Sequence, residues 1–124
     1  MKVYLAGGFK TNWQEKVKEI KSLECISPKD KENKAMSLKE YGTWDLHYIK
    51  NCDIVFAYME RTNPSGIGLA CEIGYAYGIG KTVITVLEKD NQFHEDRYMS
   101  FIEKVSHIVF ETFEEGLEYL KNFK

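Results

Sequence analysis

The sequence has few cysteines and histidines, and those it has are far apart. Among its 124 residues are three cysteines, an odd number without a Cys-x-x-Cys pair: Cys25, Cys52 and Cys71. This pattern argues against a disulfide framework or a zinc site, and it suits a reducing compartment. The histidines lack metal-ligand spacing as well: His47, His94 and His107. We therefore expect no metal site.

The sequence also lacks a long apolar run and an excess of charge of one sign. Apolar stretches such as Val83–Leu87 fall far short of the roughly 20 residues that a membrane-spanning helix requires. The apolar start of the chain reaches a Gly-Gly turn too soon for a signal peptide. With 17 Lys and Arg against 19 Asp and Glu, the formal net charge is −2, which gives no reason to expect nucleic-acid polymer binding. We expect a cytoplasmic protein that binds neither membranes nor nucleic acid.

What is present is typical of one folded globular domain over residues 1–124, since 44% of the residues are hydrophobic and 14% are aromatic. Hydrophobic periodicity and turn residues predict alternating strands and helices. Strands are expected at 2–6, 25–27, 53–58, 81–87 and 107–110. Helices are expected at 12–23, 37–51, 67–78, 98–104 and 112–122.

Local signals mark several element ends. Asn12 or Thr11 can cap the first helix, and Ser37 with Glu40 three residues later forms a capping-box pattern for the second. The polar segment 29–35 between these helices predicts an exposed loop.

The strands read as unbroken apolar runs rather than as alternating ones. That is typical of a parallel sheet covered on both faces. The predicted fold is a small doubly wound α/β fold, flavodoxin- or Rossmann-like, with a mostly parallel five-stranded sheet and helices on both faces. Ligands of such folds bind beyond the carboxyl ends of the strands, where three segments should meet: Gly7–Lys10, Met59–Gly68 and Glu88–Arg97.

Glu72 is the one charged residue between Thr62 and Gly80. Its neighbours three and four positions away on the predicted helix are uncharged, so the helix offers it no ion-pair partner. Burying a carboxylate is costly unless donors or a ligand compensate, and the nearby helix N-terminus favours an anion. We interpret Glu72 as a reactive carboxylate; a water-facing glutamate that stabilises the helix start is the alternative.

Asp45 falls on the apolar stripe of the helix predicted at 37–51. The other members of that stripe are Leu38, Tyr41, Tyr48, Ile49 and Cys52. Burial disfavours the charged form of a carboxyl group, so Asp45 would be poised to act as an acid. The alternative is a structural aspartate that accepts hydrogen bonds from backbone N–H groups or a tyrosine hydroxyl.

Glycines cluster where a ligand or a neighbouring backbone would approach closely. Gly66 and Gly68 open the third predicted helix, although helical glycine costs about 1 kcal/mol relative to alanine. Gly7 and Gly8 follow the first strand and permit close approach to a ligand. The Gly-Lys-Thr run at 80–82 enters a strand, the reverse of a phosphate-binding P-loop, so we discard a P-loop.

Three aromatic residues accompany the first strand. Phe9 directly after it, and Trp13 one turn on, could stack on a planar ring; core packing is the alternative, above all for Trp13. Tyr4 lies within the strand, and its hydroxyl must find a partner if the strand is central. A carboxylate from the next crossover is a natural partner.

Two carboxyl groups, flat aromatic rings and glycine turns favour chemistry at a glycosidic carbon. Cleavage of an N-glycosidic bond develops oxocarbenium character at C1′. One carboxylate can trap that carbon covalently while an acid assists the departing base. Those are the roles open to Glu72 and Asp45.

These residues lie in segments that resemble the nucleoside 2-deoxyribosyltransferase family, which includes the related 2′-deoxynucleoside 5′-phosphate N-hydrolases. The resemblance covers residues 2 to about 110. The segments that are similar are 2–9 (Lys-Val-Tyr-Leu-Ala-Gly-Gly-Phe), Asp45-Leu46 with Asp53-Ile54-Val55 eight residues later, 68–76 (Gly-Leu-Ala-Cys-Glu-Ile-Gly-Tyr-Ala) and Gly80-Lys81.

The resemblance implies a role for each reactive residue. Glu72 matches the family's nucleophile, which forms a deoxyribosyl-enzyme ester. Asp45 matches a helix aspartate associated with the base and proton transfer, and Tyr4 matches a tyrosine that orients the nucleophile. A neighbouring subunit completes the family's sites through a segment before a methionine, here residues 97–100. The expected substrate-binding residues are Gly7, Gly8, Phe9, Trp13, Ser65, Gly66, Gly68, Arg97 and Met99.

We therefore expect an enzyme that cleaves or transfers at the N-glycosidic bond of 2′-deoxyribonucleosides through a deoxyribosyl-Glu72 intermediate. It would need no cofactor and would form a homodimer or higher oligomer with shared sites. A hydrolase of 2′-deoxynucleoside 5′-monophosphates is the alternative, in which Arg97 could meet the phosphate unless it is only an exposed loop charge. A nucleotide-binding module without turnover and a flavodoxin-like carrier are further alternatives.

Overall fold

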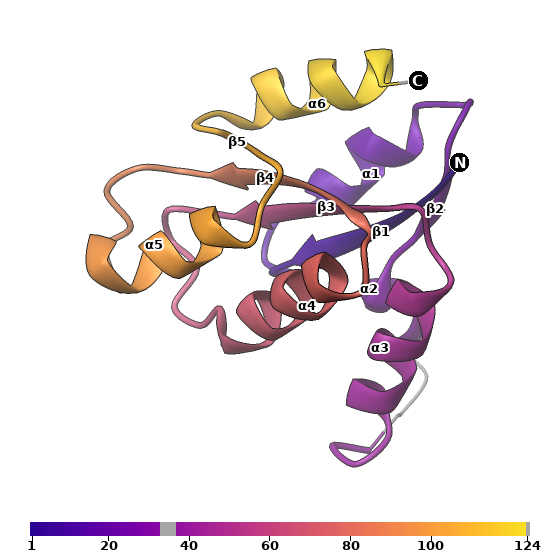
Figure 1. Cartoon of the computed structure of the whole chain (residues 1–124), viewed down its shortest axis with the longest axis horizontal. Coiled ribbons are helices and arrows are strands. Elements are labelled where there is room, and N and C mark those ends of the chain that lie inside the picture. The colour runs from indigo at the N-terminus through magenta and orange to yellow at the C-terminus, as the bar shows by residue number, and fades with distance from the viewer. Residues whose placement is uncertain (33–36, 124) are drawn as a thin grey trace.

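The computed structural model describes residues 1–32 and 37–123, and strands and helices alternate along them (Figure 1). The strands are β1 (Lys2–Gly7), β2 (Glu24–Ile26), β3 (Ile54–Met59), β4 (Thr82–Leu87) and β5 (Ile108–Phe110). The helices are α1 (Trp13–Lys18), α2 (Pro28–Glu32), α3 (Tyr41–Lys50), α4 (Ile67–Gly78), α5 (Asp96–Lys104) and α6 (Phe113–Asn122). No helix in this part of the chain is long and apolar enough to cross a membrane.

The five strands form one sheet in the order β2-β1-β3-β4-β5, and every neighbouring pair is parallel. This confirms the predicted doubly wound α/β fold, with the strand order of flavodoxin-like proteins. The strand order reverses between β1 and β3, where Tyr4 is paired with Val55. A crevice beyond the carboxyl ends of these two strands is the usual ligand position in this fold.

The sheet separates two hydrophobic clusters. Helices α3, α4 and α5 lie on one face, and α1 and α6 lie on the other (Figure 1). Successive residues of β3 alternate between the clusters, because side chains of a strand point to opposite faces: Val55 and Ala57 join the α3–α4–α5 side, and Phe56 and Tyr58 the α1–α6 side. Burial on both faces explains why the strands read as continuous apolar runs.

The prediction for the first helix was partly wrong. Helix α1 ends at Lys18, well before residue 23, and neither expected side-chain cap is formed. The Thr11 hydroxyl donates instead to the Glu60 carboxylate, and Asn12 Oδ1 accepts a hydrogen bond from Lys29 Nζ at 2.9 Å. Long-range partners therefore compete successfully with local capping.

The predicted start of the second long helix and the predicted loop before it also need correction. Helix α3 begins at Tyr41, and the Ser37 hydroxyl donates to Glu40 Oε1 at 2.7 Å in the turn before it. Leu38, expected on the apolar stripe, is 90% exposed for this reason. Helix α2 occupies part of the segment expected to be a loop, with Pro28 at its first position, where proline is favoured. Residues 33–35 of that expected loop lie outside the described residues.

The packing of α6 on the sheet gives a test of the fold. A Cβ added at Gly116 would collide with Val86 Cγ2 on β4. We expect Gly116→Ala to lower the free energy of unfolding by about 1–2 kcal/mol, because overpacking a stiff β-branched neighbour outweighs the better helix propensity of alanine. Gly42→Ala on α3, which has open space around it, should be neutral or stabilising. Urea denaturation of both variants checks this, and equal effects would contradict the packing.

Candidate functional site

The three segments predicted to meet beyond the carboxyl ends of the strands do meet, which confirms that expectation. Asn91 Nδ2 in the segment after β4 donates to the Glu60 carbonyl after β3 at 3.0 Å. The Asn63 side-chain amide lies against Gly8, 3.4 Å from where a Cβ of that glycine would stand. The edge of the sheet is therefore closed by contacts between loops that are far apart in sequence.

The three side chains predicted to be catalytic come together on the face covered by α3 and α4. Tyr4 of β1 is fully buried, and Asp45 of α3 is 8% exposed. Glu72 of α4 is half-buried, and its Oε2 atom is inaccessible to solvent. Each comes from a different element, so the site exists only in the folded chain.

The Tyr4 hydroxyl interacts with both carboxyl groups. Burial raises the pKa of Tyr4 well above its ordinary value, and the charge of Glu72 and its hydrogen bond with the hydroxyl raise this pKa further; Asp45 acts in the same direction. A phenol donates only one hydrogen bond at a time. At any moment the Tyr4 hydroxyl can therefore donate to only one of the two carboxyl groups.

The start of α4 positions Glu72. Gly66 precedes the helix with φ 126°, and a Cβ there would collide with the Met59 methyl group, so the turn requires glycine. Asn63 Oδ1 accepts the Ser65 N–H at 3.1 Å just before this turn. The close approach predicted at Gly66 is thus explained by a packed methionine.

Three predicted binding residues line one pocket of about 320 Å³ between the start of α4 and α5: Ser65, Gly66 and Met99. His94 and Tyr98 line it as well, and its surface is mainly apolar. The His94 Nε2 atom is buried and has no hydrogen-bond partner among the described residues.

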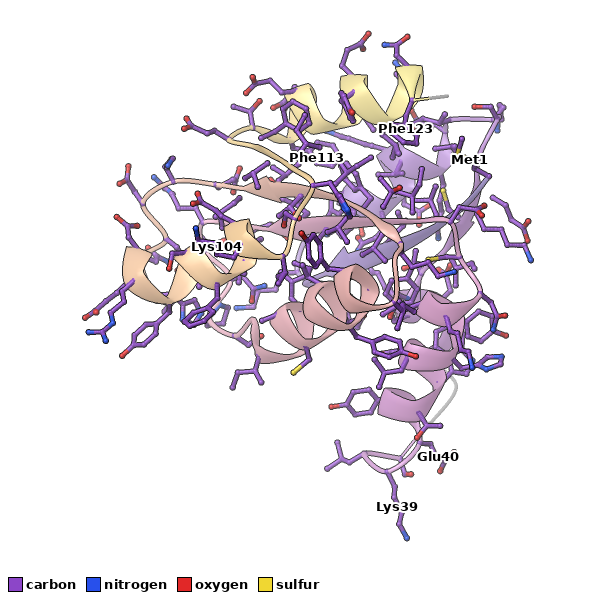
Figure 2. The ribbon with its side chains drawn as sticks, viewed as in Figure 1. Met1, Lys39, Glu40, Lys104, Phe113 and Phe123 are labelled. Atoms are coloured by element: carbon purple, nitrogen blue, oxygen red, sulfur yellow. The ribbon has the colours of Figure 1, made fainter. Side chains whose placement is uncertain are left out.

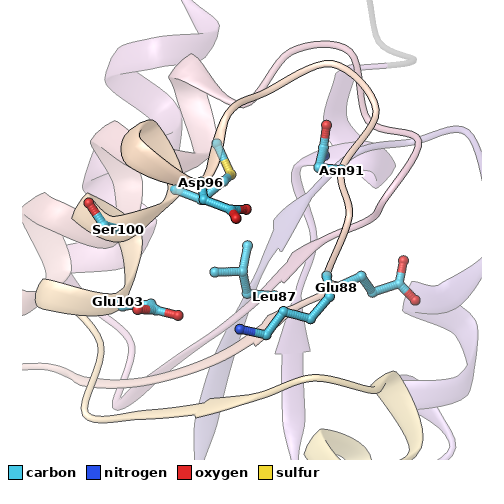
Figure 3. Close-up of a pocket in the computed structure, with 8 residues that line it drawn as sticks. Leu87, Glu88, Asn91, Asp96, Ser100 and Glu103 are labelled. Atoms are coloured by element: carbon cyan, nitrogen blue, oxygen red, sulfur yellow. The ribbon is translucent and has the colours of Figure 1, made fainter.

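A second pocket of about 270 Å³ lies between the carboxyl end of β4 and α5 (Figure 3). Asp96 and Glu103 of α5 point toward Leu87, whereas the Glu88 carboxylate points away from α5 (Figure 3). Glu88 accepts the Tyr58 hydroxyl at 3.0 Å and a backbone N–H at 2.8 Å. Despite these acids, the described residues contain no group of His, Cys, Asp and Glu that could hold a metal ion.

The remaining predicted binding residues are dispersed. Trp13 is 4% exposed and belongs to the cluster on the opposite face from Tyr4, with its indole N–H donating to the Gly8 carbonyl at 3.0 Å. This placement corresponds to the core-packing alternative. Phe9 is half-buried in the turn after β1, whereas Gly68 and Arg97 are exposed. Gly7 lies against β3, where a Cβ would stand 2.7 Å from the Tyr58 carbonyl oxygen.

Sequence reasoning missed three polar residues near the carboxyl edge. Glu60 and Asn63 are 8% and 9% exposed; the sequence places both in the segment 59–68 at the ligand-binding edge but does not indicate that they are buried. His94 was set aside because it lacks metal-ligand spacing. The only available signal was that Glu60 directly follows a buried strand, since the other contacts depend on how the loops fold together.

The raised pKa of Tyr4 predicts how stability depends on pH. The folded protein keeps the Tyr4 proton above pH 10, whereas the unfolded chain loses it near its ordinary value of 10.0. The unfolded state is therefore favoured as the pH rises through this range. We expect Tyr4→Phe to make the fall in unfolding free energy between pH 9 and 11 shallower, by about half a proton on average over this range and by nearly one proton at pH 11.

Urea titrations of both proteins measure this slope. The same comparison at pH 7, where tyrosine is protonated in both states, gives the cost of removing the hydroxyl itself. Identical slopes above pH 9 would show that Tyr4 ionises alike in the folded and unfolded chains.

Two solved structures resemble this protein over all or nearly all of its chain. A CMP N-glycosidase from Clostridium botulinum, BcmB, superposes with a TM-score of 0.62 at 23% identity, and the match covers 100% of both chains. A 2-deoxyribosyltransferase from Leishmania mexicana gives a TM-score of 0.63 at 18% identity, over 98% of this chain and 97% of that one. No curated protein sequence matches.

A family model also matches, over residues 1–90. This range includes β1, α3 and α4, the three elements that bring Tyr4, Asp45 and Glu72 together. It ends before α5 and the pocket residues on that helix. Because the match spans most of the chain, the protein belongs to the nucleoside 2-deoxyribosyltransferase-like family.

Proposed function

We propose that the protein cleaves or transfers at the N-glycosidic bond of 2′-deoxyribonucleosides or their 5′-monophosphates. The observation that supports this most strongly is the burial of the Tyr4 hydroxyl beside both Glu72 and Asp45, at the point where the strand order reverses. Family membership supports N-glycosidic chemistry in general. The roles of the individual residues are our proposal.

In the first step, a Glu72 carboxylate oxygen attacks C1′. The C1′–N bond breaks, its electron pair leaves with the base, and a deoxyribosyl ester of Glu72 forms. The departing nitrogen takes up a proton from Asp45. Water or a second base then attacks C1′ and the ester bond breaks, which regenerates the Glu72 carboxylate; the proton of the attacking group returns to Asp45.

Tyr4 acts on this step as a positioning residue. Its hydroxyl interacts with both carboxyl groups, so a hydrogen bond from it can fix the orientation of the Glu72 side chain. Burial keeps the hydroxyl protonated across the physiological range, and a neutral phenol can stabilise an anionic nucleophile without carrying charge itself.

A hydrolase of nucleoside 5′-monophosphates is the second candidate. It is supported by the full-length structural likeness to a protein described as a CMP N-glycosidase. Arg97 is exposed at the start of α5 and could contact a phosphate from there.

A binding module without turnover is a further alternative. Such a protein would keep the pocket but leave the glycosidic bond intact.

Removing the Glu72 carboxylate tests the reaction. We expect Glu72→Ala to lower base release at least about a thousandfold, as is usual when a nucleophile is deleted. The assay incubates the protein with deoxynucleosides, deoxynucleoside 5′-monophosphates and CMP, with and without a second free base, and separates the products by chromatography. Base exchange indicates a transferase, and base release without exchange indicates a hydrolase.

The matched control is Glu118→Ala, an exposed glutamate on α6, which should keep full activity. Circular dichroism shows whether both variants are folded. A wild-type protein that binds these compounds but releases no base would support the binding module. Full activity of folded Glu72→Ala would contradict the proposed nucleophile.

We also propose that two copies of the chain associate through α4 and α5 and share their sites. Large apolar side chains are exposed there: Ile67 is 82%, Tyr98 62% and Phe101 72% exposed. Such a patch is typical of a protein interface. Ile67 and Tyr98 also line the pocket of about 320 Å³, so a second copy would cover it.

A charge placed in this patch should separate the copies. We expect Phe101→Glu to halve the molar mass measured by light scattering and to lower activity, since burying an unpaired carboxylate in an interface is unfavourable. Leu38→Glu changes an apolar residue before α3 that is even more exposed than Phe101, and it should change neither property. A monomeric wild-type protein would refute the shared site.

A further inference from the structure

Glu60 lies on the opposite face of the sheet from Tyr4 and Glu72. It follows β3 immediately, and it lines a pocket of about 310 Å³ together with Tyr58 of that strand, Trp13 of α1 and Phe113 of α6. Those three aromatic residues belong to the hydrophobic cluster on the α1–α6 side. The proposed reaction uses neither this pocket nor Glu60.

The Glu60 carboxylate is buried with few partners. The residue is 8% exposed, and the Thr11 hydroxyl, 3.2 Å from each oxygen, is the only donor to these oxygens in the described part of the chain. A carboxylate has about four acceptor sites. Burial raises the pKa of Glu60, the Thr11 hydrogen bond opposes this, and the nearby Glu88 charge adds to it.

No ion pair between described residues includes Glu60. Lys10 is near enough to lower its pKa but does not reach salt-bridge distance. The buried carboxylate therefore keeps acceptor capacity that a donor-rich cation could fill.

The aromatic wall of the pocket consists of rings that pack against one another at different angles. The Tyr58 and Phe113 rings stack with centroids 5.0 Å apart and planes at 29°, and Trp13 meets Tyr58 edge-on at 5.5 Å. Phe113 lies at the start of α6, above the sheet (Figure 2). Each of the three rings is at least nine-tenths buried, so the wall offers a narrow apolar surface in a fixed position.

The charged residues around the pocket favour a cation. Among the residues that line the pocket, Glu60 and the exposed Glu114 contribute two carboxylates and Lys16 one ammonium group, whereas Lys10 and Lys29 are near it but do not line it. Lys16 itself stands 6.0 Å from the centre of the Phe113 ring, which shows that this wall accommodates a positive charge next to an aromatic face.

We propose that this pocket is a second ligand site that binds a planar amidinium or guanidinium group. Two parallel N–H donors of such a group match the two oxygens of the Glu60 carboxylate, and a flat body attached to it would lie against Trp13, Tyr58 and Phe113. A compact ammonium ion lacks this planar, two-pronged shape and would fit less well.

Benzamidine is the probe, because it joins an amidinium group to one aromatic ring. The readout is the indole N–H resonance of Trp13 in a ¹⁵N-labelled protein, with Trp44 on the other face as an internal reference. We expect benzamidine to shift the Trp13 resonance saturably and leave that of Trp44 in place. The neutral analogue benzamide should bind about tenfold or more weakly.

Glu60→Gln should weaken benzamidine binding about tenfold or more, whereas Glu118→Gln on the exposed side of α6 should not change it. The remaining ¹⁵N spectrum shows whether Glu60→Gln keeps the fold, and the benzamide comparison tests the role of charge without any substitution. A shift that does not saturate, equal shifts of both tryptophans, or equal binding of benzamide would overturn the proposal.

Discussion

The site depends on one buried hydroxyl, that of Tyr4, which interacts with two carboxyl groups. Tyr4 on the interior strand β1 interacts with both Glu72 of α4 and Asp45 of α3, residues that would otherwise place two like charges in an apolar layer. Burying two carboxylates without donors would be strongly unfavourable. A phenol that stays protonated because it is buried reduces that cost by donating a hydrogen bond. In the proposed mechanism the same arrangement brings the nucleophile and the acid together.

The fold makes this arrangement possible. Parallel strands order the elements so that the helices following β2 and β3 pack side by side over β1, and the carboxyl ends of β1 and β3 open toward the crevice where this fold places its ligands. The turn at Gly66, packed on Met59, determines where α4 starts and therefore where Glu72 lies. The loops after β3 and β4 close the edge through the Asn91–Glu60 hydrogen bond.

The sequence could predict both the fold and the contact of Tyr4 with a carboxyl group, because both predictions depend on recognising buried apolar segments. Buried parallel strands are continuous apolar runs, and against such a background Glu72 and Asp45 are conspicuous charges. It could not predict which face of the sheet Trp13 covers, because periodicity indicates burial but not the partner. Glu60 and His94 were missed because their burial depends on loops meeting in space. Leu38 was misplaced because the helix begins only at Tyr41.

The most direct test of the central claim is to locate the sugar on the enzyme during turnover. The wild-type protein is mixed with a 2′-deoxynucleoside, quenched in acid and digested, and the peptides are analysed by mass spectrometry. The predicted result is a deoxyribosyl group on the peptide that contains Glu72. In Tyr4→Phe this adduct should be absent or less abundant, because the substitution disturbs the position of the Glu72 carboxylate. An adduct on a different residue, or turnover with no adduct at any time point, would contradict a reaction through Glu72.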